Sequence, residues 1–226
     1  MCGRFASTTP PDKLAEYFGA ETSVPADEFE PDYNVAPTRD VPVVRIREQA
    51  RHLDYLRWGL VPRWAKDLRI GSKMINARAE TVATKNSYRS AFSKRRCLVT
   101  ADGFYEWKRL DAKTKQPMYI TRRDGDPLAF AGLYERWSDA ENHREIHTCT
   151  IITTTPNRTM AEIHDRMPVL LAPKHWDEWL DSDNADTESL SELLIPAPDA
   201  LLIAYPVSEQ VNNVRNNEPS LIAPIA

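Results

Sequence analysis

The chain has 226 residues, of which 42% are hydrophobic and 27% are charged. This balance is typical of a soluble globular protein, and the length suits one domain with a sizeable core, spanning residues 1–226. The formal net charge of −4 excludes the overall basic excess by which nucleic-acid-binding proteins are usually recognised. Arg and Lys are nevertheless frequent between residues 57 and 123, whereas residues 177–192 are acidic. The sequence therefore allows a local basic face, although charge alone favours a solvated surface of mixed sign.

The N-terminal part of the chain contains clear helix and strand signals. A Thr-Pro-Pro sequence at residues 9–11 is typical of a helix start, and Gly19 is a natural stop. The proline-rich residues 24–38 are predicted to be irregular. Apolar and charged residues alternate over residues 41–47 and 53–58, which predicts two strands.

The rest of the chain mixes strands with short helices. Residues 76–93 are rich in helix formers and are predicted to form one or two short helices. Residues 97–101 are predicted to form a strand that stops at an Asp-Gly pair, and residues 118–122 and 128–134 are predicted to form a hairpin around a second one. This order lacks regular β-α-β alternation, which predicts an α+β fold: a largely antiparallel sheet that curls into a barrel-like core, with short peripheral helices. Further strands are predicted at 146–154 and 201–206, and further helices at 157–164, 173–180 and 187–194.

The cysteine and histidine positions indicate neither a disulfide framework nor a metal site. Cys2, Cys97 and Cys149 have no regular spacing, which favours a reducing cytosol. No apolar run is long enough for a signal peptide or a membrane span, so we expect a cytoplasmic protein. His143 and His147 lie near Cys149, but at a predicted loop-to-strand junction where their spacing does not converge. No metal and no other cofactor is predicted.

Cys2 carries the most distinctive chemistry in the sequence. A small second residue permits removal of Met1, which leaves Cys2 with a free α-amine whose pKa is roughly 7.7–8.0. Such an amine attacks an aldehyde to give a Schiff base. The adjacent thiol adds to that Schiff base at high effective molarity and closes a five-membered thiazolidine ring. No internal residue has a free amine with which to do this.

The residues after Cys2 suit this chemistry. Gly3 lets another backbone approach closely. Arg4 can hold a phosphate through two hydrogen bonds, and its charge is expected to favour the Cys2 thiolate. A chance cysteine at position 2 is the alternative, and Cys2 considered alone favours that alternative.

Six short blocks occur in order at residues 1–5 (MCGRF), 33–37 (YNVAP), 58–62 (WGLVP), 76–81 (NARAET), 102–107 (DGFYEW) and 163–168 (IHDRMP). With these blocks the chain resembles the SRAP family (SOS-response-associated peptidases), whose members crosslink to abasic sites in single-stranded DNA. The resemblance covers nearly the whole chain. It implies the SRAP fold and a role in DNA repair during the SOS response, at the bacterial nucleoid or replication fork.

The resemblance implies a role for each polar residue of the blocks. Cys2 is the nucleophile, and Asn76 resembles the asparagine beside the Cys2 amine and the opened sugar. Glu106 resembles the catalytic carboxylate. His164 resembles the imidazole that handles protons at the sugar hydroxyl, and Asn34 resembles a further polar active-site residue.

Contacts with DNA are predicted from charged and apolar residues together. In the family, Arg4 and Arg78 resemble the phosphate clamps. Trp64 follows an arginine in a predicted loop, where an exposed ring can stack on an unpaired base. Some bacterial relatives have two adjacent tryptophans here, whereas this chain has Ala65 after Trp64; Trp58 is expected in the core. The predicted substrate-binding residues are Arg4, Asn34, Pro37, Trp64, Arg78, Trp107 and Arg166.

Two of the predicted catalytic residues also have structural interpretations. The aromatic neighbours of Glu106 would raise its carboxyl pKa, which suits an acid near neutrality. Alternatively, Glu106 pairs with Lys108 on an exposed strand. His164 could instead be a residue at a helix end that is bonded to Asp165, and the local sequence alone favours that interpretation.

Several functions remain open from the sequence. The leading prediction is a monomeric sensor of abasic sites in single-stranded DNA that forms a reversible thiazolidine crosslink, without membrane partners. One alternative is an amidotransferase-like hydrolase in which the α-amine of Cys2 is the general base. A second is a peptidase, a label that could reflect only removal of Met1. A third is a DNA-binding module that recognises modified bases without bonding to them.

Overall fold

The computed structural model describes residues 2–25, 28–139 and 144–225. Its strands are β1 (Phe5–Ser7), β2 (Glu21–Thr22), β3 (Asp32–Val35), β4 (Asp40–Arg47), β5 (Ala50–Trp58), β6 (Asn76–Arg78), β7 (Arg96–Ala101), β8 (Gly103–Arg109), β9 (Lys115–Arg122), β10 (Leu128–Asp139), β11 (Arg144–Thr154), β12 (Met167–Pro168) and β13 (Leu202–Pro206). The α-helices are α1 (Pro11–Phe18), α2 (Arg89–Lys94), α3 (Arg158–Ala161), α4 (Trp176–Leu180) and α5 (Thr187–Glu192). Short 3-10 helices lie at Leu68–Lys73, Pro173–His175, Asp199–Leu201, Glu209–Asn212 and Pro219–Ile222. No helix in the described ranges combines the length and apolar character needed to cross a membrane.

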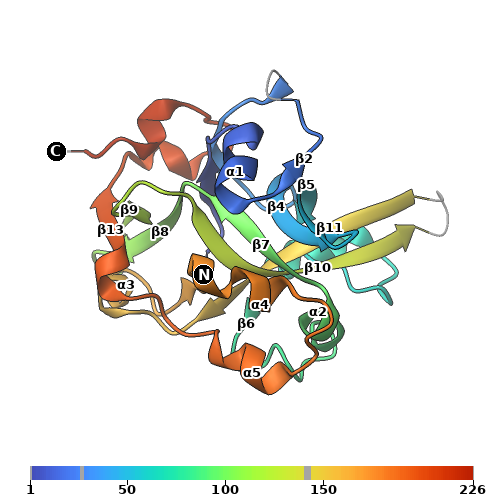
Figure 1. The fold of residues 1–226 in the computed structure, drawn as a ribbon. Coiled ribbons are helices and arrows are strands. Elements are labelled where there is room, and N and C mark those ends of the chain that lie inside the picture. The colour runs from blue at the N-terminus through green and yellow to red at the C-terminus, as the bar shows by residue number, and fades with distance from the viewer. Residues whose placement is uncertain (1, 26–27, 140–143, 226) are drawn as a thin grey trace.

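Five strands of the larger of two sheets close into a barrel (Figure 1). This sheet has the order β12-β11-β10-β7-β4-β5-β2, and the neighbours from β11 to β5 are antiparallel. A parallel pairing of β5 with β11, through Trp58 and Cys149, closes the ring. The smaller sheet has the antiparallel order β13-β9-β8-β1-β3. The predicted α+β fold, with a largely antiparallel barrel-like core and short peripheral helices, is confirmed.

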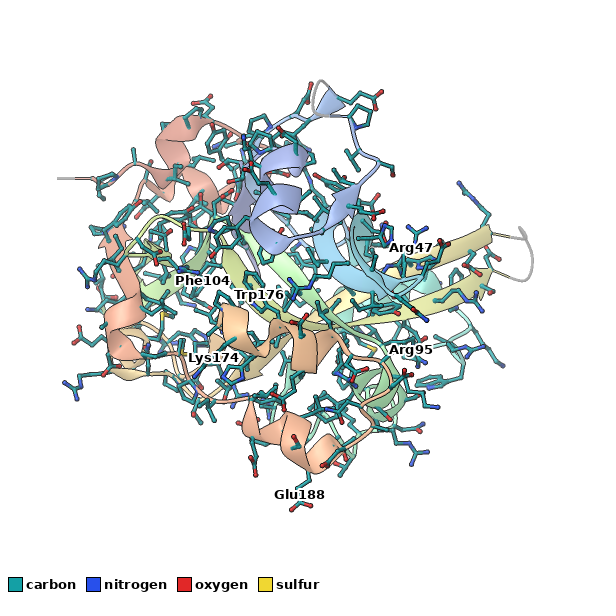
Figure 2. The ribbon with its side chains drawn as sticks, in the orientation of Figure 1. Arg47, Arg95, Phe104, Lys174, Trp176 and Glu188 are labelled. Carbon is teal, nitrogen blue, oxygen red and sulfur yellow. The ribbon has the colours of Figure 1, made fainter. Side chains whose placement is uncertain are left out.

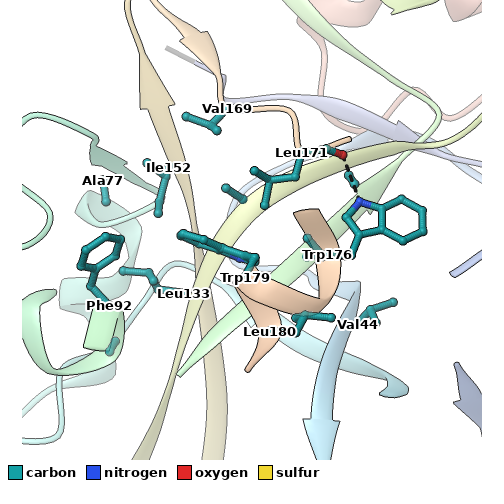
Figure 3. Packing of buried hydrophobic residues seen from close by; sticks show 14 of the residues in the cluster. Val44, Ala77, Phe92, Leu133, Ile152, Val169, Leu171, Trp176, Trp179 and Leu180 are labelled. Carbon is teal, nitrogen blue, oxygen red and sulfur yellow. Dashed lines mark hydrogen bonds between the residues drawn. The ribbon is translucent and has the colours of Figure 1, made fainter. Parts of the chain in front are cut away.

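The barrel strands are buried on both faces. Successive side chains of a strand point to opposite faces, and the buried Val43 and Val44 of β4 accordingly belong to two different apolar clusters. In one cluster, Phe5 of the smaller sheet packs against Trp58 of the barrel with ring centroids 5.0 Å apart. In the other, α2 and α4 pack their aromatic side chains against the opposite face of the barrel (Figure 3). The smaller sheet is thereby fixed to the barrel on the side where Cys2 lies.

Most predicted elements are present, although the helices are shorter than expected. α1 ends at Gly19, whose φ of 59° and ψ of 42° are the left-handed conformation that glycine adopts readily. α3 has only four residues, because the chain turns away after Ala161. The predicted strands at 41–47, 53–58, 97–101, 146–154 and 201–206 correspond to β4, β5, β7, β11 and β13.

Three predictions about secondary structure are wrong. Residues 24–38 are not irregular throughout, because β3 pairs with β1. Residues 76–93 begin with a strand, β6, which adds to β11 in parallel, and only the end of this segment is helical. Residues 118–122 and 128–134 do not form a hairpin, because β9 pairs with β8 and β13 whereas β10 pairs with β7 and β11. In each case, long-range pairing decides the structure.

The sequence analysis also missed β8, the strand that carries Glu106. The Asp-Gly pair does end β7, but the chain then enters the smaller sheet at once. Gly103 is needed there for close packing, since a Cβ at this position would clash with the ring of Tyr119 on β9. This glycine therefore marks a close approach between two strands.

Candidate active site

Cys2 lies fully buried directly before β1. Its exposed fraction is 0%, and it belongs to the apolar cluster that contains Phe5 and Phe104. Burial raises the pKa of the Cys2 thiol well above its usual range, and the negative charge of Glu106 acts in the same direction. Arg4 acts in the expected direction, because its backbone N–H lowers the thiol pKa, but burial outweighs this effect and the net shift opposes the thiolate. The thiol is protonated at neutral pH.

Asn76 holds the backbone at Cys2. It stands at the start of β6, which the parallel pairing with β11 fixes in place through Ile151. The Nδ2 of Asn76 donates to the Cys2 carbonyl at 2.8 Å. Its Oδ1 is buried and has no hydrogen-bond partner among the described residues. Because an unsatisfied buried acceptor is costly, this oxygen is suited to a donor on a bound group.

Glu106 lies on β8 and is only 3% exposed. Burial raises the pKa of its carboxyl group, while the nearby imidazole of His164 partly offsets that effect. The alternative in which Glu106 pairs with Lys108 is wrong, since the Lys108 ammonium lies instead 4.0 Å from the carboxylate of Glu162. Glu106 is thus a buried carboxyl group that keeps a proton more readily than an exposed one.

His164 lies beside Glu106, just after α3. Its Nε2 is 3.9 Å from the Oε2 of Glu106. Its Nδ1 accepts the backbone N–H of Arg166 at 3.0 Å and also lies 2.9 Å from the carboxylate of Asp165. The sequence allowed two interpretations of His164, as a catalytic imidazole or as a helix-end residue bonded to Asp165. In the structure, the ring contacts both Glu106 and Asp165.

Replacement of Glu106 by glutamine is expected to stabilise the fold at neutral and higher pH. Because the carboxyl pKa is raised, the folded state holds this proton more tightly than the unfolded state does. Stability is therefore lost as the pH rises from the unfolded pKa through the folded one. Glutamine does not titrate. Its advantage should be absent near pH 4 and grow as the pH rises through the folded-state pKa of the Glu106 carboxyl, so that the variant melts at a higher temperature near pH 8. Thermal melting of both proteins across this range measures it, and a pH-independent difference would contradict the prediction.

Arg4 and Asn34 form a second cluster that ties the start of the chain to its C-terminal part. Nη1 of Arg4 donates to Oδ1 of Asn34 at 2.6 Å and to the Val211 carbonyl at 2.9 Å. Asn34 is 1% exposed, and its Nδ2 donates to the carbonyls of Asn213 at 3.0 Å and Asn216 at 2.9 Å. The Nε of Arg4 is buried without a hydrogen-bond partner among the described residues. Asn34 therefore orients Arg4, whose Nε donor remains for an anion.

The two other predicted arginines differ in their surroundings. Arg78 is exposed on β6, two residues after Asn76, and its guanidinium makes no hydrogen bond to the part of the chain that the structure describes. Arg166 is held by the carboxylate of Glu80 at 2.5 and 2.9 Å and by the carbonyl of Thr153. Arg78 is thus available to a ligand, whereas most donors of Arg166 already have partners.

The predicted aromatic and apolar contacts lie at different depths. Trp58 is fully buried, as predicted, and its Nε1 donates to the Ile75 carbonyl. Trp64 is 57% exposed, which confirms the prediction of an exposed ring. Trp107 and Pro37 are half-buried. The Trp107 ring lies 6.0 Å from the guanidinium carbon of Arg4, within cation–π range, so it belongs to the Arg4 cluster.

Sequence reasoning missed the contribution of the C-terminal segment to this cluster. Oδ1 of Asn212 accepts the Nε1 hydrogen of Trp107 at 2.7 Å. Oδ1 of Asn217 accepts the backbone N–H of Tyr33 at 2.7 Å. The paired asparagines at 212–213 and 216–217 were the available signal, since asparagine side chains commonly bond to backbone groups in turns.

The histidines and cysteines outside this site show no metal-binding arrangement. In the described ranges, no group of three His, Cys, Asp or Glu is placed to hold a metal ion. His143 lies outside the described residues. His147 contacts Arg45 and Glu145 instead, and Cys149 is a buried free thiol.

Comparison with known proteins gives this arrangement a family. Residues 1–214 match the family described as SOS response associated peptidase (SRAP). The chain belongs to the SRAP family. The six sequence blocks and the grouping of Cys2, Asn76, Glu106 and His164 therefore occur within an SRAP fold.

Relatives in the SRAP family cover the chain almost completely. The abasic site processing protein YoqW of Bacillus subtilis is 48% identical, over 98% of this chain and 99% of its own. The abasic site processing protein YedK of Escherichia coli is 35% identical over 100% of both chains. The abasic site processing protein HMCES of Xenopus tropicalis is 32% identical over 100% of this chain and 78% of its own. A crystal structure of a protein from Bacteroides thetaiotaomicron superposes with a TM-score of 0.89 at 26% identity, covering 100% of both chains.

Proposed function

We propose that this SRAP-family protein bonds covalently to abasic sites in single-stranded DNA, through Cys2 after removal of Met1. The observation that carries the proposal is the grouping of a buried N-terminal cysteine with an amide, a carboxyl and an imidazole from Asn76, Glu106 and His164. The relatives named as abasic site processing proteins support abasic DNA as the substrate.

The proposed reaction needs only the groups at this site. Removal of Met1 turns the peptide nitrogen of Cys2 into an amine, which adds to the open-chain aldehyde of the abasic sugar. The carbinolamine then loses one water to leave a Schiff base. The thiol sulfur adds to the imine carbon while its proton passes to the imine nitrogen, which closes the thiazolidine. Removal of Met1 by hydrolysis consumes one water, the reaction with the aldehyde releases one water, and no oxidant or reductant is consumed.

The protonation states at the site support this chemistry over thiolate chemistry. Because the pKa of the Cys2 thiol is raised, the sulfur still carries the proton that passes to the imine nitrogen. A cysteine hydrolase would need a thiolate near neutral pH, which burial opposes. We therefore limit the proposed peptidase activity to removal of the residue before Cys2. The raised pKa of Glu106 suits it to protonate the departing water.

Single-stranded DNA is the proposed substrate because Cys2 is buried. An abasic sugar can reach a fully buried thiol only where the strand bends away from its stack, and an unpaired strand does this at a lower cost than a duplex. The exposed Arg78 and the buried Nε of Arg4 are proposed to hold the flanking phosphates. Trp64 is proposed to stack on an unpaired base.

Incubation with an oligonucleotide that contains one abasic site, followed by a denaturing gel, tests the proposal. The expected result is a band shifted by the mass of one oligonucleotide, and intact mass spectrometry should show that the reacting protein has lost Met1. The matched controls are an undamaged strand and an abasic strand reduced beforehand with borohydride, which has no aldehyde. If the shifted band is lost under denaturing conditions, the protein is a non-covalent DNA-binding module. If protein that retains Met1 forms the crosslink, the amine mechanism is wrong.

A further inference from the structure

A second concave site lies on the barrel, apart from the Cys2 cluster. It is a pocket of about 340 Å³ where β4, β10 and β11 meet the segment after β5 and the residue after α2. Figure 2 labels Arg47 and Arg95 on the side from which the β10–β11 ribbon projects, away from Phe104. Its charged lining consists of five arginines and one acid: Arg45, Arg47, Arg63, Arg95, Arg136 and Glu135.

The deepest arginine is held rigidly. Nε of Arg45 donates to the Asp54 carboxylate at 2.6 Å, and its guanidinium carbon lies 5.0 Å from the ring centre of Tyr134. Its Nη1 is 2.8 Å from Nδ1 of His147. Because an arginine always donates, that Nδ1 is an acceptor, and the His147 proton sits on Nε2, 3.0 Å from Glu145. The contact with His147 therefore leaves the positive charge of Arg45 in the pocket.

The carboxylates around the pocket do not balance its arginines. Arg47 shares Asp54 with Arg45, while Arg95 pairs with Glu135 at 3.0 Å and Arg136 pairs with Glu145 at 3.4 Å. Five guanidinium groups therefore face three carboxylates, which leaves an excess of two positive charges. Arg63 makes no ion pair with the part of the chain that the structure describes.

One donor in the pocket also has no acceptor. The Nε of Arg95 is buried and makes no hydrogen bond to any described residue. A buried charged donor without an acceptor carries a desolvation cost that a bound anion would remove. Planar guanidinium groups match the oxygens of a phosphate through paired hydrogen bonds.

We propose that this pocket binds a phosphate group, supplied by the backbone of a DNA strand that runs past Trp64. Arg63 directly precedes the exposed Trp64 in the chain, so a phosphate held at Arg63 would bring a neighbouring base to the Trp64 ring. The strand assignment rests on the proposed function, whereas phosphate binding by the pocket does not. The site would bind undamaged DNA independently of the Cys2 chemistry.

The test compares two charge-matched double variants. Arg63→Gln with Arg136→Gln removes two exposed arginines of the pocket. Arg109→Gln with Lys115→Gln removes two exposed cations from the β8–β9 turn and serves as the control.

Affinity for undamaged single strands of increasing length is measured by fluorescence anisotropy at several salt concentrations. The pocket variant should lose affinity about tenfold for long strands only, and its salt slope should fall by roughly 0.7, as for one lost phosphate contact. The control variant should keep the wild-type length dependence.

Thermal melting with inorganic phosphate tests the pocket without DNA. Phosphate should raise the Tm of the wild type and of the control variant by more than that of the pocket variant, which keeps Arg4 and Arg78 near Cys2. If phosphate separates the Tm values in this way but the pocket variant keeps the wild-type affinity for long strands, the pocket does not contact a DNA strand. It then binds a free phosphate compound. If neither measurement separates the two variants, the whole proposal is wrong. Crosslinking of a short abasic oligonucleotide should be equal in all three proteins. If none of them forms the crosslink, the proposed function is wrong, but the conclusion about phosphate binding by the pocket is unaffected.

Discussion

Replacement of Cys2 by serine is expected to abolish the durable crosslink while leaving a Schiff base that borohydride can trap. The α-amine is unchanged in this variant, so its attack on the aldehyde continues. The serine hydroxyl cannot close a ring as stable as a thiazolidine, and the product reverts to free DNA. Since ring closure draws on the high effective molarity of the neighbouring thiol, the heat-stable product should fall by about 10²-fold or more. Denaturing gels run with and without borohydride measure both species.

Cys97 provides the matched control for this experiment. It is also a free cysteine with 0% exposure, but it lies on β7 of the barrel. Cys97→Ser should crosslink as the wild type does, at a temperature where melting shows that it is folded. If Cys2→Ser gave as durable a crosslink as Cys97→Ser, the thiol would have no part in the bond.

The variants Glu106→Gln and His164→Ala are expected to affect different steps. An abasic sugar is mostly a closed hemiacetal, so one group must take the anomeric proton while another protonates the ring oxygen. The imidazole of His164 suits the second task, because imidazoles both hold and give protons near neutrality. Its removal should slow crosslink formation and release alike. Loss of the Glu106 carboxyl should mainly slow formation, because it would serve the Cys2 amine and the departing water. Each effect should be about 10²–10⁴-fold.

Time courses of formation, and of exchange onto a competing labelled oligonucleotide, separate these two roles. Glu188→Gln and His175→Ala are the matched controls, since they make the same changes of side chain at an exposed position of α5 and at a half-buried position just before α4. Both controls should react as the wild type does. If neither Glu106→Gln nor His164→Ala changed either rate by about tenfold, the proton transfers would belong to water or to Asn76.

At position 106, the change from glutamate to glutamine is expected to raise stability and to lower activity. A buried carboxyl with a raised pKa costs folding free energy above its unfolded pKa, and the same raised pKa keeps a proton at hand for catalysis. The variant should therefore melt higher and react more slowly. Both results together would indicate that this carboxyl is retained for its chemistry rather than for the fold.

The barrel could be predicted from sequence because its strands carry strong local patterns. Residues 41–47 and 146–154 are rich in β-branched residues, and their burial on two faces follows from these apolar runs. β8 was missed because Gly103 looks like a turn glycine, whereas it permits contact with Tyr119 in the sheet. The predicted hairpin failed because an Asp-Gly pair does not reveal which strands its flanks join.

The composition of the candidate site could not be derived from local patterns. Cys2, Asn76, Glu106 and His164 come from four distant blocks, and only the family resemblance grouped them before the structure did. The net direction of the Cys2 pKa shift could not be predicted, because the sequence shows the charge of Arg4 but not the burial of the thiol. The pocket around Arg45 has no sequence signature, since the register of three strands assembles it.

The bonds of Asn34 have a consequence for the order in which the protein is made. Its amide reaches carbonyls at residues 211, 213 and 216, which lie 177, 179 and 182 positions further along the chain. On the ribosome, Arg4 and Asn34 emerge early, and these carbonyls follow only after every strand of both sheets has been synthesised. A growing chain therefore contains Cys2 from the start of translation, but it cannot orient Arg4 until almost all of the protein has been made. Nascent chains should accordingly remain poor binders of DNA phosphates until translation is nearly complete.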